Sequence, residues 1–259
     1  MNFKSKLQKA IAQNNSLLCV GLDPDPANLN GAKSQFEFNK KIIDQTSDFV
    51  CVYKPNIAFY EAEGLKGLED LKKTIDYLKK NLPHIPIILD AKRADIPNTA
   101  RMYAKSVFEY WGADAVTVYP NLGLDSVEPF LAYKDKLTIL LLKTSNLGSG
   151  TFQDMKLGTT PYYEKMAQVI KKWQFDNIGI FVGATYPQQL KRLRDIFPDQ
   201  IFLSAGMGAQ SAEIAKAVRA GVDKNGEGIM YNASRSIIYS NNPRKSAQNL
   251  RDEINKYRK

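Results

Sequence analysis

The chain has 259 residues, of which 44% are hydrophobic, and this is enough to fill the core of one large domain. With one histidine and two widely separated cysteines, the composition argues against a His-based metal site and against a Ser-His-Asp triad. The net charge is +9, but Lys and Arg spread along helical segments and gather mainly at 244–259, which is typical of a solvated basic face. We therefore expect no nucleic-acid partner, and acid and base chemistry must fall to Lys, Asp or Glu.

The cysteines and the N-terminus indicate where the protein works. Cys19 and Cys51 lie inside apolar runs, without the spacing of metal ligands or of a redox pair, and we interpret them as buried, reduced thiols of a cytoplasmic protein. The charged N-terminus precedes a short apolar run with no small-residue cleavage site. No segment approaches the length of a membrane span, so the sequence predicts no membrane partner.

Apolar runs typical of strands alternate with amphipathic stretches typical of helices along the whole chain. The predicted strands are 17–22, 50–57, 85–89, 115–118, 137–142, 178–182, 201–204 and 228–232. The predicted helices lie near 38–49, 65–81, 98–111, 124–134, 161–173, 187–197, 211–220 and 243–257, with Pro161, Pro187 and Pro243 in first turns and Gly112 and Gly221 at helix ends. Strands separated by helices pair in parallel through right-handed crossovers. This predicts an α/β fold, a single-domain (β/α)8 TIM barrel over residues 1–259.

A doubly wound open sheet is the alternative fold, and the placement of polar residues decides between the two. In strand after strand they follow the C-terminal end, as at Asp23, Lys54, Asp90, Lys92, Thr144, Ser145, Gly206 and Arg235. In a closed barrel these ends ring one mouth, where barrel enzymes keep their active sites. In an open sheet they would lie along an edge, so the barrel is favoured.

The segment 88–96, Ile-Leu-Asp-Ala-Lys-Arg-Ala-Asp-Ile, ends an apolar strand in a charged cluster. Asp90 and Lys92 are two residues apart, so an extended strand points both side chains to one face. Asp95 can turn back toward Lys92 or reach a neighbouring subunit. A lysine between carboxylates stays protonated, which indicates an acid or a cation rather than a Schiff base. A structural ion pair is the alternative, but the predicted mouth with Lys54 beside it favours chemistry.

The seventh and eighth loops of a barrel frequently hold phosphate. Here they supply Ala205-Gly-Met-Gly-Ala-Gln210 and Arg235. Glycines let backbone N–H groups approach phosphate oxygens, and the guanidinium of Arg binds them bidentately. A Gly-x-Gly alone is more often a plain turn, but beside Arg235 it indicates a phosphate site.

An ordered series of motifs resembles orotidine 5'-phosphate decarboxylase, most closely the longer bacterial branch of that family. The motifs run from the first predicted strand to the last: Gly21-Leu-Asp23-Pro, Lys54-Pro-Asn56, Asp90-x-Lys92-x-x-Asp95-Ile96, Lys143-Thr-Ser-Asn146, Gly208-Ala-Gln210 and Ser234-Arg235-Ser. The resemblance implies a cofactor-free carboxy-lyase without a metal, which converts orotidine 5'-monophosphate to uridine 5'-monophosphate and CO2. This is the last step of de novo pyrimidine (UMP) biosynthesis. The resemblance also implies a homodimer with shared active sites.

The resemblance further implies a role for each matching residue. Lys92 would protonate C6 after CO2 has left, Asp90 would lie beside the substrate carboxylate, and Lys54 would complete the charge network. Asp95, Ile96 and Thr99 would reach into the partner's site. The implied substrate-binding residues are Asp23 for the ribose hydroxyls, Thr144 and Ser145 for the pyrimidine edge, Gln210 between base and phosphate, Arg235 for the phosphate, and also Asn56, Gly208 and Ser234.

Two loops leave questions open. The loop at 205–212 is shorter than is usual in the family, so closure over the phosphate is expected to differ in detail. The connection 146–160 contains three glycines and is either a mobile lid or an ordinary surface loop.

Two other functions are weaker alternatives. A magnesium-dependent sugar-phosphate decarboxylase of the same suprafamily ranks second, because Lys54 beside Lys92 would repel a metal. A barrel that binds RNA through its basic surface ranks third.

Overall fold

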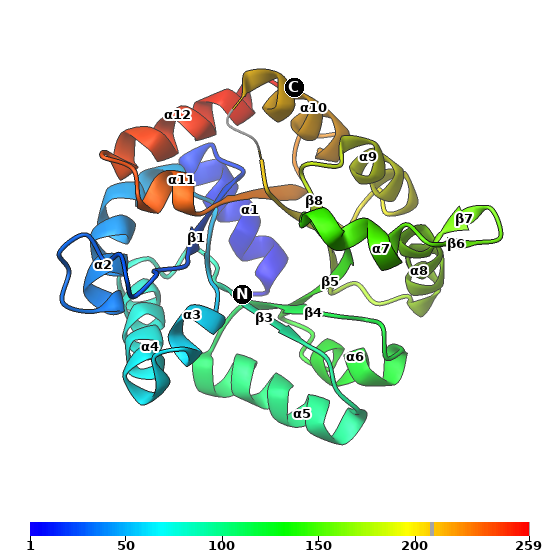
Figure 1. Cartoon of the computed structure of the whole chain (residues 1–259), viewed down its shortest axis with the longest axis horizontal. Helices are drawn as coiled ribbons and strands as arrows, with labels where there is room; N and C mark the ends of the chain where they lie inside the picture. Colours follow the sequence, from blue (N-terminus) through cyan, green and yellow to red (C-terminus); the bar gives the residue numbers. More distant parts are fainter. Residues whose placement is uncertain (208–209, 259) are drawn as a thin grey trace.

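Eight parallel strands form a barrel surrounded by helices (Figure 1). The computed structural model describes residues 1–207 and 210–258. The barrel strands are β1 (Leu18–Leu22), β2 (Val52–Pro55), β3 (Ile88–Arg93), β4 (Ala115–Val118), β5 (Leu137–Lys143), β8 (Ile178–Gly183), β9 (Ile201–Ala205) and β10 (Ile229–Ala233). Their order, β2-β1-β10-β9-β8-β5-β4-β3, places each strand beside the next one along the chain. The predicted (β/α)8 barrel is confirmed, and the open sheet is wrong.

The barrel closes between β2 and β3, where backbone pairing is sparse. Two isolated parallel bridges join these strands, one from Tyr53 to Ile87 and one from Asn56 to Asp90. Beside the second bridge, the N–H of Ile57 donates to the carbonyl of Asp90 at 3.3 Å. We call this closure the β2–β3 seam. Because its backbone bonds are few, side chains that cross it matter for keeping the barrel shut.

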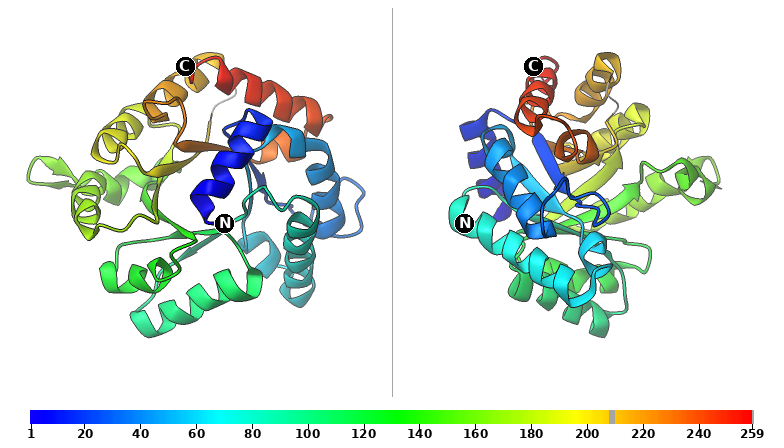
Figure 2. Two further views of the ribbon diagram at one scale, coloured as in Figure 1. Left: turned by 180° about the vertical axis from the view of Figure 1, so that it is seen from behind. Right: turned by 60° about the vertical axis from the view of Figure 1, so that its left-hand side comes forward.

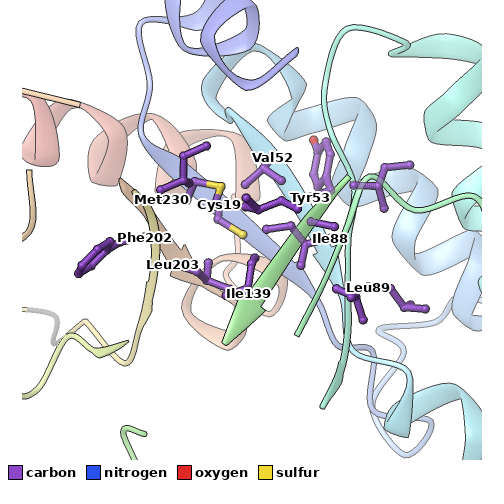
Figure 3. Close-up of a cluster of buried hydrophobic side chains, with 14 of the residues drawn as sticks. Cys19, Val52, Tyr53, Ile88, Leu89, Ile139, Phe202, Leu203 and Met230 are labelled. Atoms are coloured by element: carbon purple, nitrogen blue, oxygen red, sulfur yellow. The ribbon is translucent and has the colours of Figure 1, made fainter. Parts of the chain in front are cut away.

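Apolar side chains fill the barrel, and Figure 3 shows part of this core. Cys19, Val52, Ile88, Leu203 and Met230 come from five different strands and are all completely buried. Helices cover the outside of the barrel, so both faces of each strand are buried. This is why the strands read in the sequence as continuous apolar runs. Both cysteines are free and buried, as predicted.

The outer helices fall where the sequence predicts them: α2 (Gln35–Thr46), α4 (Gly64–Asn81), α5 (Pro97–Lys105), α6 (Leu124–Leu131), α8 (Tyr162–Ile170), α9 (Pro187–Ile196), α10 (Ser211–Gly221) and α12 (Pro243–Asn255). Three of the predicted helices change character in their last turns, with 3₁₀ helices at Ser47–Phe49 and Lys171–Trp173 and a π-helix at Ser106–Trp111. Pro187 and Pro243 begin their helices as predicted. The first-turn placement of Pro161 is wrong, because this residue ends a short strand and lies just before α8. Among the described residues, no helix is both long and apolar enough to cross a bilayer.

Several elements outside the repeating pattern escape sequence reasoning. They are the helices α1 (Phe3–Asn14), α3 (Ala58–Glu61), α7 (Gly150–Gln153) and α11 (Arg235–Ile238), and the antiparallel strands β6 (Lys156–Leu157) and β7 (Thr160–Pro161). The segment from α7 to β7 fills the connection 146–160, and its hairpin protrudes at the side of the molecule (Figure 1). The three short helices are single turns, too short to leave a hydrophobic period in the sequence.

Helix α1 covers the N-terminal end of the barrel and is seen in front of the strands in the left view of Figure 2. Its Leu7 and Ala10 are buried. At its start, the ammonium of Lys6 pairs with Asp114, just before β4, at 2.7 Å. The N–H of Phe3 donates at 2.8 Å to the carbonyl of Asp135, just before β5. Helix α1 therefore closes the end of the barrel opposite the carboxyl ends of the strands.

We expect Leu7→Ala to lower the free energy of unfolding by about 3 kcal/mol, because it leaves a cavity under α1. Leu7 is only 2% exposed. Urea denaturation measures the change, and the exposed neighbour Gln8 provides the control. Gln8→Ala should change the stability by less than about 0.5 kcal/mol, and equal effects of the two variants would contradict a packed α1.

Candidate active site

The carboxyl ends of the barrel strands carry the predicted site residues to one mouth. Lys54 lies in β2, and Asp90 and Lys92 lie in β3. Asp23 follows β1, Thr144 and Ser145 follow β5, and Ser234 and Arg235 follow β10. The topology therefore brings together residues that are more than 200 positions apart in the chain, from Asp23 to Arg235.

Glycines allow the loops of the mouth to approach the strands closely. A Cβ atom on Gly21 would lie 1.9 Å from Oγ of Ser234, and one on Gly183 would lie 2.8 Å from Cα of Ser145. Real Cβ atoms do not approach other atoms so closely, so these positions require glycine. The close contacts fix Ser234 against β1 and Ser145 against β8.

Three side chains surround the carboxylate of Asp90. The ammonium of Lys54 lies 2.9 Å from Oδ2 of Asp90, and the ammonium of Lys92 lies 2.7 Å from Oδ1. The hydroxyl of Thr117 donates to Oδ1 at 2.8 Å. Lys54 and Asp90 are buried, whereas the side chain of Lys92 is 41% exposed toward solvent. The prediction that Asp90 and Lys92 share a face is confirmed.

The charges of this network are stable across neutral pH. Burial alone would raise the pKa of Asp90, but Lys54 and Lys92 outweigh burial and hold that pKa well below its ordinary value. Burial alone would lower the pKa of Lys54, but Asp23 and Asp90 together raise that pKa above its ordinary value. Asp90 is therefore an anion and Lys54 a cation at physiological pH.

The backbone at Lys92 adopts a left-handed conformation with φ of 44°. The pairing of β3 with β4 is irregular between Leu89 and Arg93, and the N–H of Lys92 donates to Oγ1 of Thr117 at 3.0 Å. β3 therefore continues past its predicted end at Leu89, but in distorted form. Sequence reasoning missed Thr117, because one threonine within an apolar strand carries no distinguishing signal. Its hydroxyl connects the backbone of Lys92 with the carboxylate of Asp90.

Asp95, Ile96 and Thr99 form no hydrogen bond or ion pair with Lys92 within the described part of the chain. The carboxylate of Asp95 accepts the N–H of Ile96 at 2.8 Å. Within residues 1–207 and 210–258, Asp95 forms no ion pair, so the local pairing with Lys92 is not made. Ile96 is 63% exposed, and Thr99 is partly buried in α5.

The remaining predicted residues within the described part of the chain bring further polar groups to the loops that follow the strands. Oδ1 of Asp23 is buried and has no hydrogen-bond partner in the described part of the chain. Oδ1 of Asn56 accepts the N–H of Ala58 at 3.2 Å. Gln210 and Arg235 are exposed at the starts of α10 and α11. Gly208 lies outside the described residues.

The single histidine lies far from this chemistry. His84 is in the connection before β3, on the side of the barrel covered by α1, and burial followed by Lys9 and Lys6 lowers its pKa. In the part of the chain that the structure describes, no three His, Cys, Asp or Glu side chains are grouped so that they could hold a metal ion.

Charged residues at the carboxyl end of a (β/α)8 barrel are the arrangement of a barrel enzyme. The family model for "Orotidine 5'-phosphate decarboxylase / HUMPS family" matches residues 16–250. The chain belongs to this family, as the sequence motifs predict, and it is a carboxy-lyase.

Full-length relatives and solved structures agree with this assignment. The chain is 44% identical to orotidine 5'-phosphate decarboxylase of Cellvibrio japonicus over 98% of both chains, and 42% identical to that of Ralstonia nicotianae over the full length of both. It also matches the structure of Leishmania donovani OMP decarboxylase with a TM-score of 0.90 and 38% identity, covering 100% of this chain and 99% of that one.

The pKa of Asp90 leads to a prediction about acid stability. A carboxylate whose pKa is depressed in the folded state stabilises the fold above its ordinary pKa of 3.8, and this stabilisation is lost as the pH falls toward the depressed value. We expect Asp90→Asn to cost on the order of 3 kcal/mol at pH 7, because Lys54 loses its buried partner.

Urea denaturation at several pH values measures this difference between wild type and Asp90→Asn. It should be constant between about pH 7 and 5 and shrink below about pH 4. The exposed Asp195 supplies a control, since Asp195→Asn should matter little at any pH. A difference that widens in acid would contradict the assigned charge state.

Proposed function

We propose that the chain converts orotidine 5'-monophosphate to uridine 5'-monophosphate and CO2 without a cofactor, and that Lys92 protonates C6 of the pyrimidine. The observation that carries this proposal is the Lys54–Asp90–Lys92 network at the barrel mouth, with ammonium–carboxylate distances of 2.9 and 2.7 Å. Family membership supports the substrate.

The network suits a carbanion reaction. Loss of CO2 leaves an electron pair at C6 without a conjugated sink, so a fixed cation close by must stabilise the charge as it develops. Lys92 is held by Asp90 and still faces the open mouth. Its N–H bond then donates the proton to C6, which forms the new C–H bond and quenches the carbanion. The carboxylate of Asp90 would repel the substrate carboxylate beside it. This repulsion raises the energy of the bound substrate and promotes loss of CO2.

The other predicted residues bind parts of the nucleotide that are distant from the reacting carbon. Asp23, with its unpartnered carboxylate oxygen, is the ligand proposed for the ribose hydroxyls. The proposed ligands are Thr144 and Ser145 for the pyrimidine edge, Gln210 between base and phosphate, and Arg235 for the phosphate. Asn56, Gly208 and Ser234 are proposed as further substrate-binding residues. Binding energy from the distant phosphate can then lower the activation free energy of the reaction at C6.

A homodimer with shared sites would use Asp95, Ile96 and Thr99, none of which bonds to Lys92 of its own chain within the described residues. Ile96, Met102 and Leu122 are between 54% and 63% exposed, and they lie on or beside the adjacent helices α5 and α6. Exposed apolar side chains grouped in this way are typical of an interface. Asp95 and Thr99 next to them would then enter the partner's mouth. We also place the chain at the last step of de novo pyrimidine synthesis, in the cytoplasm.

The magnesium-dependent alternative gains no support from the geometry. Lys54 is 4% exposed, and its ammonium occupies one oxygen of Asp90, while Lys92 occupies the other. A divalent cation at this carboxylate would have to displace a buried ammonium.

Lys92→Ala should lower kcat for orotidine 5'-monophosphate by a factor on the order of 10³, because it removes the proton donor and a charge that stabilises the carbanion. An ultraviolet assay with EDTA present measures turnover and tests the metal-dependent alternative at the same time. Uridine 5'-monophosphate should still bind. The exposed Lys66 on α4 gives a matched control, since Lys66→Ala should leave kcat unchanged. Near-normal turnover of Lys92→Ala would refute the mechanism.

Mixing two inactive variants tests the shared site. If Asp95 serves the partner, a Lys92→Ala subunit paired with an Asp95→Ala subunit has one intact site and one site that lacks both residues. After dissociation and random reassociation, half of the dimers are mixed, so activity should return to about a quarter of the wild-type value. No recovery, although mixed dimers form, would show that each chain completes its own site.

A further inference from the structure

Lys143, the last residue of β5, is a completely buried lysine that the proposed chemistry does not use. Its ammonium lies 2.8 Å from both carboxylate oxygens of Asp154 and 4.6 Å from the ring centre of Tyr186. A buried ammonium without a counter-charge is strongly unfavourable. Lys143 therefore requires Asp154, and Asp154 lies just after α7, in the connection 146–160.

The residue before Asp154 makes a second attachment to the end of β5. Oε1 of Gln153 accepts the N–H of Thr144 at 2.9 Å, and Nε2 of Gln153 donates to Oγ1 of Thr144 at 2.9 Å. Two consecutive residues at the end of β5, Lys143 and Thr144, thus hold two consecutive residues of the connection. We call Lys143, Thr144, Gln153 and Asp154 the β5 latch.

The latch acts on a strand end that bulges near the mouth and packs against β8. The pairing of β5 with β8 shifts between Leu141 and Lys143, so the end of β5 bulges before it reaches the mouth. Ser145 is wedged against the backbone of Gly183, as the 2.8 Å approach to its Cα shows. Gln153 and Asp154 add their contacts with Thr144 and Lys143 to this packing.

The two partners of the ion pair differ in exposure, so breaking the pair costs Lys143 more free energy than it costs Asp154. The side chain of Lys143 is 0% exposed, whereas that of Asp154 is 44% exposed. If the connection lifts away, Asp154 regains water but Lys143 stays in the interior without a partner. The free-energy cost of opening therefore falls on Lys143, and it favours the docked position of the connection.

We propose that the β5 latch orients Thr144 and Ser145 for contact with the pyrimidine edge, and that Lys143 and Asp154 are positioning residues for the base. Neither side chain touches the nucleotide. They act by fixing the strand end that does. This inference rests on the proposed function, which assigns the pyrimidine edge to Thr144 and Ser145.

The experiment compares a ligand that has a base with one that lacks it. For Asp154→Asn, we expect the inhibition constant of uridine 5'-monophosphate to rise by about tenfold, and kcat/KM for orotidine 5'-monophosphate to fall by a similar factor. Ribose 5-phosphate, which has the sugar and the phosphate but no base, should inhibit wild type and variant within about twofold of each other. The exposed Lys156 on the same connection is the control, since Lys156→Gln leaves the latch intact and should change neither constant.

A second variant guards against unfolding, because Asp154→Asn leaves a buried ammonium without a counter-charge. Lys143→Met together with Asp154→Leu removes both charges and keeps an apolar interior. It should melt close to the wild-type temperature and still bind uridine 5'-monophosphate about tenfold more weakly, with ribose 5-phosphate unaffected.

Three results would overturn the inference. Unchanged binding of uridine 5'-monophosphate in the double variant would show that the latch does not position the base. Equal weakening of both ligands would show a general structural role instead. A wild-type protein that neither decarboxylates orotidine 5'-monophosphate nor binds the product would overturn the proposed function itself, and wild-type controls distinguish this outcome from the first two.

Discussion

The mouth of the barrel depends on one buried carboxylate that balances two ammonium groups. Asp90 keeps Lys54 charged in a buried place and draws Lys92 to the same point from the other side. Lys54 in particular would not stay in place if Asp90 were neutral, because a buried cation that loses a counter-charge tends to be expelled or to lose its proton. The two lysines hold the pKa of Asp90 down, and Asp90 together with Asp23 holds the pKa of Lys54 up.

The barrel itself could be predicted from the sequence, because each strand is buried on both faces and reads as an apolar run. The predicted and observed bounds of the fourth strand agree at both ends, Ala115–Val118. Helix α1 precedes the repeating unit and was not predicted, although its buried residues Phe3, Leu7, Ala10 and Ile11 follow the spacing of one helix face. The position of Pro161 was predicted wrongly because a proline just before a helix and a proline in its first turn look alike in sequence.

The candidate site was partly accessible to sequence reasoning. The spacing of two residues indicates that Asp90 and Lys92 lie together, although the backbone at Lys92 is not extended as that reasoning assumes, and the motif order indicates Lys54 and Arg235. The left-handed backbone of Lys92 and the bridging hydroxyl of Thr117 were not accessible, because both arise from the irregular pairing of β3 with β4. Likewise, nothing in the spacing of Lys143 and Asp154 distinguishes a buried ion pair from two solvated charges.

The Lys54–Asp90 contact also has a structural role at the β2–β3 seam. This contact joins the two strands at the closure where only isolated backbone bridges hold them. The same two side chains therefore belong to the proposed catalytic network and also join β2 to β3. A substitution made at either position to alter the proposed chemistry also weakens the closure of the barrel, so a redesign of the reaction in this scaffold must first supply another connection between these two strands.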